Sequence, residues 1–244
     1  MGDILYNSVM SRKITFAINE YYHIYNRGVD KRVIFENDSD YKRFVLLLYL
    51  CNGKSPVNFN SLSNWKNPTS PELVKDIFNY DRGKQIIALG AYCLMPNHFH
   101  ILAREISENG ISTFMHKVGT AYTMYFNGCR ERIGALFQGT YKAGHANNDE
   151  YLKYLFSYIH LNPVKIIEPN WKEKGIADEQ KTKRYLVSYP YSSYMDYLGI
   201  KREFSKIIDW KNFPDYFPSK STFNKCLDDW LKFTPKDKSK KAKP

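Results

Sequence analysis

The sequence predicts an α+β sandwich in which helices pack on a mainly antiparallel sheet. Strand-like and helix-like segments alternate along the 244 residues, and two of the strands are joined too tightly to run parallel. The composition, with 43% hydrophobic and 25% charged residues, is that of a globular protein rather than a disordered or fibrous one. We therefore expect one elaborated domain with a full hydrophobic core.

The first third of the chain predicts one strand, one helix and an insertion. Residues 21–29 alternate tyrosines and aliphatic residues with polar ones, which is typical of a strand. The pair Asp38-Ser39 is expected to cap a helix over 40–50. Residues 52–84 are rich in Asn, Ser, Pro and Gly and predict a loop-rich insertion with one short helix at 71–78.

The centre of the chain predicts a hairpin. Residues 85–95 form an almost unbroken apolar run suited to a central strand, and the turn signal Pro96-Asn97 leads into a second strand over 98–103. Strands connected this closely must be antiparallel. A helix with apolar residues at helical spacing is expected from Ser112 to Gly128.

The last part of the chain is predicted to be mainly helical, with charged connections. Short strand pieces in 135–146 precede a helix over 150–161, which Asn148-Asp149 caps and Asn162-Pro163 stops. Three further segments are expected: a charged loop at 164–184, a turn with a short helix at 189–199, and an amphipathic helix at 225–233.

Charge and aromatic content favour a polyanionic partner. The net charge is +11, and residues 231–244, which are expected to be disordered, carry six lysines against one aspartate. The 20 tyrosines can supply stacking platforms for unpaired bases, although a compositional bias of the genome explains them as well. Both features fit nucleic acid.

Four scattered cysteines indicate neither a zinc knuckle nor a disulfide framework, because no CxxC pair occurs among Cys51, Cys93, Cys129 and Cys226. No signal-peptide pattern opens the chain, and no apolar run approaches membrane-spanning length. We therefore expect a cytoplasmic protein without a membrane partner.

Two histidines, His98 and His100, stand two residues apart on the second hairpin strand. Side chains alternate along a strand, so both should point to one face, with Cα atoms roughly 7 Å apart, and could chelate one divalent cation. Histidines at this spacing also occur by chance on solvent-facing strands. The pair alone does not specify a metal site.

The surrounding sequence AYCLMPNHFHILARE resembles the HUH signature of the small single-tyrosine insertion-sequence transposases, including the REP-associated tyrosine transposases. Residues 94–100 all stand where that family carries similar residues. The resemblance covers about residues 15–200. Four further segments match the family in the expected order: YHIYNRGVDKRVIF at 22–35, ALFQGTYKA at 135–143, YLKYLFSYIHLNPVK at 151–165 and YPYSSY at 189–194.

The resemblance implies a catalytic function for specific residues. It places the nucleophilic tyrosine of the motif SYIHLNP at Tyr158, with Mg²⁺ or Mn²⁺ held by His98 and His100. Asn162 lies four residues after Tyr158, so it should share a helical face with it and complete the metal site. The fold expected with this site is a ferredoxin-like sandwich that carries the HUH motif on a central strand.

The implied reaction is cleavage and strand transfer of single-stranded DNA through a 5′-phosphotyrosine and a free 3′-hydroxyl, with the hairpin-bearing repeats of such relatives as the candidate target. Four basic residues in segments that resemble family motifs are expected to contact phosphates: Arg27, Lys31, Arg32 and Lys142. The alternative is that they lie in solvated loops and contact no DNA. A monomer is favoured over a dimer that shares active sites.

Other residues compete for the proposed roles. Tyr151, Tyr154 and Tyr158 are spaced as a buried aromatic stripe would be, and Tyr122 and Tyr125 are further nucleophile candidates whose default role is packing. His160 should point away from the metal, since it lies nearly opposite Tyr158 on the helix. The remaining histidines considered, His23 and His145, are ambiguous.

Three domain segments follow: a catalytic domain at 1–200 that contains the insertion, a helical extension at 201–230 and the basic tail at 231–244. Two other functions stay open. A non-catalytic regulator would bind single-stranded nucleic acid without a covalent product, and a metal-dependent phosphodiesterase would use water in place of Tyr158.

Overall fold

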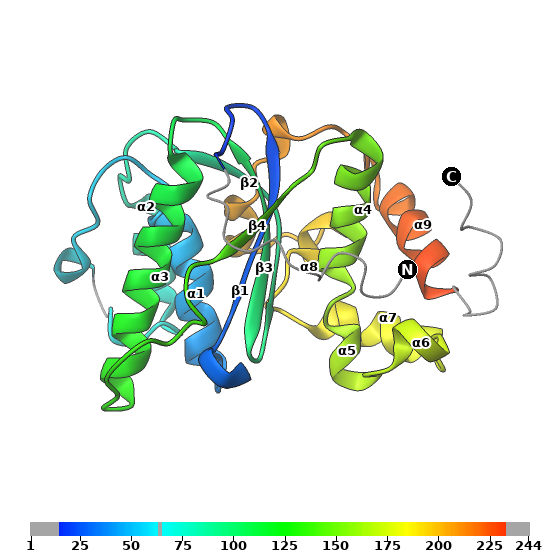
Figure 1. The fold of residues 1–244 in the computed structure, drawn as a ribbon, viewed down its shortest axis with the longest axis horizontal. Helices are drawn as coiled ribbons and strands as arrows, with labels where there is room; N and C mark the ends of the chain where they lie inside the picture. Colours follow the sequence, from blue (N-terminus) through cyan, green and yellow to red (C-terminus); the bar gives the residue numbers. More distant parts are fainter. Residues whose placement is uncertain (1–14, 63–64, 233–244) are drawn as a thin grey trace.

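The computed structural model describes residues 15–62 and 65–232 and places four strands in one sheet with helices on both faces (Figure 1). Every neighbouring pair is antiparallel, and the order across the sheet is β2-β3-β1-β4. The strands are β1 (Tyr21–Arg27), β2 (Ile87–Met95), β3 (His98–Glu105) and β4 (Lys142–His145).

Two helices connect these strands in the order expected for a ferredoxin-like fold. Helix α1 (Asp38–Leu50) follows β1, and α3 (Gly110–Cys129) follows the β2–β3 hairpin. The sequence of elements is thus β-α-β-β-α-β, with the short α2 (Pro71–Asn79) inserted before β2. This confirms the predicted fold class, and β3, which carries the histidine pair, lies inside the sheet between β1 and β2.

The first face of the sheet is covered by α1, α2 and α3 (Figure 1). Its core is rich in aromatic rings, and Phe44 lies at the centre, with the rings of Phe35, Phe99 and Tyr122 within 5.2 Å of its own. Each such side chain contributes about 1.5–3 kcal/mol when it leaves water. This face is the principal apolar core of the described structure.

The second face is covered by α4 (Asp149–His160), α8 (Tyr194–Tyr197) and α9 (Lys220–Leu231). Ala91 and Cys93 of β2 present small side chains to this core, whereas their neighbours Tyr92 and Leu94 belong to the first. The period-two alternation of a strand therefore separates the two cores. Phe223 of α9 is fully buried here, so α9 is part of this packing.

The segment 164–184, predicted to be a loop, is largely helical. It contains α5 (Val164–Ile167), α6 (Trp171–Lys174) and the start of α7 (Glu179–Ser188). Buried Trp171 and Leu186 hold these short helices on the second core, and the Asp178 side chain caps α7 by accepting a hydrogen bond from the Lys181 amide. The prediction was wrong because a few buried residues are hidden among many charged ones.

Other predicted elements are confirmed with shifted ends. Helix α1 begins at Asp38 after the cap Asn37, α3 begins two residues before Ser112, and α9 begins at Lys220. The remaining elements are 3-10 turns: η1 (Val29–Lys31), η2 (Phe59–Ser61), η3 (Glu203–Ile207) and η4 (Trp210–Asn212).

The expected tail lies outside the described residues from position 233 onward, and the domain boundaries stay predictions. Within residues 15–62 and 65–232, no helix combines the length and the apolar character that crossing a membrane requires.

Candidate active site

The histidine pair lies on the face of β3 that points toward α4. The rings of His98 and His100 are 5.0 Å apart and nearly perpendicular. His100 is buried and His98 half-buried, because β3 is flanked on both sides by other strands. The structure thus brings the two imidazoles together on one face, as the alternation of the strand predicts.

Burial controls the charge of both rings. It lowers the pKa of His98 to about 4, with further lowering by the positive charges of Lys165 and Arg27. Burial also lowers the pKa of His100 well below its usual value, and the neighbouring histidines and lysines act in the same direction. Both imidazoles are therefore uncharged at neutral pH, the state in which a ring nitrogen can bind a cation.

Tyr158 reaches the histidines from helix α4. Its ring packs edge-on against His100, with 5.5 Å between ring centroids. The side chain is half-buried, since Leu155 and Ile159 on the neighbouring side of α4 anchor the helix in the second core. Asn148 caps α4 by accepting a hydrogen bond from the Tyr151 amide at 2.7 Å. The tyrosine and the histidine pair thus lie side by side.

The competing tyrosines lie elsewhere. Tyr122 is fully buried on the first face, where its hydroxyl donates to the carbonyl oxygen of Ile34. Tyr125 donates to Asp40 on the same side of the sheet. Tyr154 is next to Tyr158 on α4 but packs between it and Trp230 of α9, with ring centroids 5.8 and 5.2 Å away. The Tyr158 ring, in contrast, packs against His100.

Asn162 lies in the turn after α4, because the helix ends at His160. The helix thus stops two residues before Asn162, which nevertheless remains beside Tyr158. Its side-chain nitrogen donates to the carbonyl oxygen of Tyr158 at 2.8 Å and stabilises the end of the helix. Asn162 is buried, and its role as a metal ligand stays a prediction.

Two of the four predicted phosphate-binding residues face the histidines. Arg27 is directly opposite His98 in the β1–β3 pairing. Lys142 is opposite Tyr25, which in turn is opposite His100, so these three side chains form one row across the sheet. Both basic side chains are exposed.

The other two basic residues, Lys31 and Arg32, lie at the turn that follows β1. The carbonyl oxygen of Lys31 accepts a hydrogen bond from the Asn97 side chain, beside the histidine strand. Gly28 allows this turn to fold back, since a Cβ atom there would lie 2.4 Å from the Arg32 carbonyl oxygen.

Two lysines of the unpredicted helices add positive charge at the site. The ammonium of Lys172 on α6 lies 4.6 Å from the centre of the Tyr158 ring. Lys165 on α5 is close enough to both histidines to lower their pKa values. The sequence analysis does not predict a role for Lys165 and Lys172, because it assigns residues 164–184 to a loop. Their position in the sequence, just after the helix that carries Tyr158, is the one feature that could have indicated that they lie near the site.

His23 on β1 is the third histidine of the site. Its Nε2 is 2.9 Å from Nδ1 of His100, and its ring packs edge-on against Tyr158 at 5.6 Å. Tyr21, His23 and Tyr25 are every second residue of β1, so the sequence indicates that they share one face of the strand. Only the pairing of β1 with β3 shows that this is the face that carries His98 and His100.

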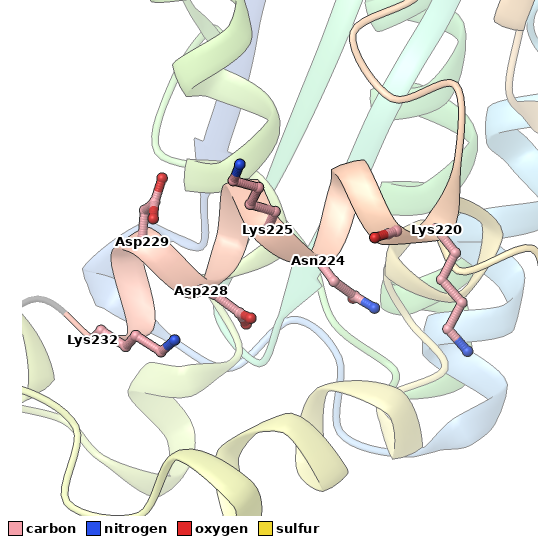
Figure 2. Close-up of a pocket in the computed structure, with 7 residues that line it drawn as sticks. Lys220, Asn224, Lys225, Asp228, Asp229 and Lys232 are labelled. Atoms are coloured by element: carbon pink, nitrogen blue, oxygen red, sulfur yellow. The ribbon is translucent and has the colours of Figure 1, made fainter.

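The remaining histidines lie away from the pair. His160 points into the second core and shares a 2.7 Å hydrogen bond with Ser193, as expected from its place opposite Tyr158. His145 is exposed and pairs with Glu20. A surface hollow along α9 (Figure 2) contains none of the site residues and is lined by lysines and aspartates of that helix.

No curated protein matches the chain. A solved structure described as the REP-associated tyrosine transposase bound to a REP hairpin aligns with a TM-score of 0.47 and 10% identity, over 84% of this chain and 98% of that one. The family model described as "Transposase IS200 like" matches residues 64–162, which include both histidines of the pair and Tyr158. Residues 64–162 of this chain are therefore similar to the IS200-like transposases.

Proposed function

We propose that the protein is a metal-dependent nuclease and strand transferase for single-stranded DNA that works through a covalent 5′-phosphotyrosine at Tyr158. The observation that carries this proposal is the packing of the Tyr158 ring against His100, 5.5 Å away, beside the His98 ring. This arrangement supports the proposal, because a phenol that can act as a nucleophile lies beside two imidazoles that can bind a cation.

The pair His98 and His100 fits a divalent cation by the chemistry of its donors. Each Nδ1 has a hydrogen-bond partner, which leaves Nε2 of each ring as the atom for a metal. The described residues contain no cluster of three or more His, Cys, Asp and Glu side chains that could hold a metal. Further ligands would be oxygen atoms, and we propose Asn162 and the DNA phosphate as their sources. A bound Mg²⁺ or Mn²⁺ would polarise the scissile phosphate as a Lewis acid.

The covalent step belongs to Tyr158. Its oxygen forms a bond to phosphorus while the bond from phosphorus to the 3′ oxygen breaks; the phenol proton passes to water, and the leaving oxygen takes up a proton. The phosphotyrosine retains the energy of the phosphodiester. A strand with a free 3′-hydroxyl can therefore displace Tyr158 without ATP.

Positive charge around the site suits a phosphodiester. Lys165 and Lys172 approach from α5 and α6, and Arg27 and Lys142 from the sheet. Such side chains position a backbone without reading its sequence. We propose that Lys31 and Arg32 extend this surface, that hairpin-forming repeats are the substrate, and that the protein acts as a monomer.

The test uses single-stranded oligonucleotides labelled at either end, with and without a hairpin. We expect Mg²⁺- or Mn²⁺-dependent nicking, with the 5′-phosphate side of the cut attached to the protein in a denaturing gel. Tyr154→Phe, which removes a hydroxyl one helical turn earlier, is the matched control and should still form the adduct. A Tyr158→Phe variant that forms the adduct would remove Tyr158 from this role.

The two other functions give different results in the same experiment. A phosphodiesterase that uses water would cut the DNA without an adduct and remain active as Tyr158→Phe. A non-catalytic regulator would bind the labelled strand without cutting it, and His98→Ala would leave that binding unchanged.

A further inference from the structure

His23 occupies a position that neither the sequence motif nor the proposed reaction assigns. It lies in the middle of β1, buried, with its ring 5.0 Å from the ring of His100 and the two planes 21° apart. On its other sides the ring contacts Tyr25 at 5.1 Å and Tyr158 at 5.6 Å. These three neighbours hold the His23 ring in one orientation.

The contact between the two histidines has a defined chemistry. A separation of 2.9 Å between Nε2 of His23 and Nδ1 of His100 is a hydrogen bond, so one nitrogen donates and the other accepts. If His23 donates, neutral His100 carries its proton on Nε2 and has no lone pair there. If His100 donates, its Nε2 lone pair is available to a cation.

The second histidine of the pair, His98, has a defined protonation site. Nδ1 of His98 lies 2.6 Å from Oδ1 of Asn97, an oxygen that can only accept, so His98 carries its proton on Nδ1. The Asn97 amide is itself oriented, because its nitrogen donates to the carbonyl oxygen of Lys31 at 3.2 Å. His98 is thereby fixed with Nε2 unprotonated.

We infer that His23 is a positioning residue that accepts the Nδ1 proton of His100 and so leaves the Nε2 of His100 free to bind a cation. Asn97 performs the same function for His98. Both imidazoles of the pair then present Nε2 lone pairs, through two different acceptors. The inference rests on the proposed function in one respect, namely that it takes His100 as a metal ligand.

The direct test is the protonation state of the ring nitrogens in metal-free protein. Long-range ¹H–¹⁵N correlation spectra of ¹⁵N-histidine-labelled protein distinguish protonated from unprotonated ring nitrogens, and six histidines can be assigned by single substitutions. We expect His100 to carry its proton on Nδ1 and His23 to have an unprotonated Nε2. A proton on Nε2 of either residue would overturn the inference.

The second test changes the acceptor. His23→Leu removes it, whereas His23→Gln can accept through its side-chain oxygen. Loss of a partner of this kind typically weakens metal binding roughly 10- to 100-fold. We expect such a loss of Mn²⁺ affinity, measured by calorimetry without DNA, in His23→Leu and a smaller loss in His23→Gln. The control is His145→Ala, which removes an exposed histidine of the neighbouring strand.

The outcomes separate this inference from the proposed function. Wild-type Mn²⁺ affinity in folded His23→Leu contradicts the role of His23, whatever the enzyme does to DNA. Conversely, failure of the wild-type protein to form an adduct would contradict the proposed function, while the protonation states would still decide the inference. If His23→Leu does not fold, the wild-type spectra and His23→Gln decide it.

Discussion

The two faces of the sheet use the same strands in different ways. Along β3, Phe99 and Ile101 enter the apolar core under α1 and α3, whereas His98 and His100 point toward α4. The first face is packed mainly with apolar and aromatic side chains, and the second combines its apolar packing with four histidines. One strand can therefore stabilise the fold and carry the candidate site at once, because its side chains alternate.

Three of the polar side chains on the second face are tolerated because each has a hydrogen-bond partner. His100 bonds with His23, His160 with Ser193, and Asn162 with the end of α4. A buried polar group without a partner costs about 1–3 kcal/mol. We therefore expect changes on the first face to act on stability and changes on the second to act on chemistry or on its pH dependence.

The largest effect is expected for Tyr158→Phe. Loss of the nucleophilic oxygen should reduce adduct formation by at least about 1,000-fold, with a change in unfolding free energy within about 0.5 kcal/mol because the side chain is half-buried. Adduct yield in denaturing gels and urea unfolding measure the two quantities. The counterpart on the first face, Tyr122→Phe, should lose about 1 kcal/mol of stability and no activity. A loss of activity in Tyr122→Phe, or a loss of stability without a loss of activity in Tyr158→Phe, would contradict this difference between the two faces.

Phe44→Ala should show the opposite pattern. Removing this fully buried ring from the centre of the first core should lower the unfolding free energy by about 3–5 kcal/mol. Adduct formation per folded molecule, measured at a temperature where the variant remains folded, should stay near the wild-type rate. A specific loss of activity at full folding would show that the two faces are coupled.

Acid should destabilise the protein through the second face. Burial lowers the pKa of His160 to about 3 from the value of about 6.5 in an unfolded chain. The unfolded chain thus binds more protons between these values, so the stability from His160 is complete above about pH 6.5 and falls as the pH decreases. From pH 6.5 to 5 this loss is about 2 kcal/mol.

The measurement is the urea midpoint as a function of pH in wild type and His160→Leu, which should have a shallower slope below pH 6.5. His116→Ala, at an exposed position on α3, is the control and should keep the wild-type slope. Equal slopes in all three proteins would mean that His160 does not contribute to the acid sensitivity.

The smallest effect concerns Lys172 beside Tyr158. If it contacts a phosphate of the bound strand, Lys172→Gln should reduce the slope of log affinity against log salt by about 0.7. Fluorescence anisotropy with a labelled single strand in metal-free buffer measures this slope. Lys174, exposed on the same helix, provides the matched Lys174→Gln control. Identical slopes for the two variants would place Lys172 outside the DNA contact.

The strands and the histidine pair could be predicted because they depend on local pattern. The apolar run before Pro96 and the alternation around His98 fix both strands and the shared face of the pair. The contribution of His23 could not be predicted, since it depends on the pairing of β1 with β3 across 77 residues of sequence. Likewise, the positions of Lys165 and Lys172 near the site could not be predicted, because they depend on the packing of short helices through buried Trp171. The many charged residues around Trp171 give no pattern that indicates these helices.

We propose Tyr158 as the residue that becomes joined to DNA. The most direct measurement is proteolysis of the protein–oligonucleotide adduct, followed by mass spectrometry of the peptide that carries the nucleotide. We expect one modified peptide, with the added mass of the 5′-phosphorylated strand on Tyr158. Modification of Tyr151, Tyr154 or any other residue, with Tyr158 intact, would contradict it.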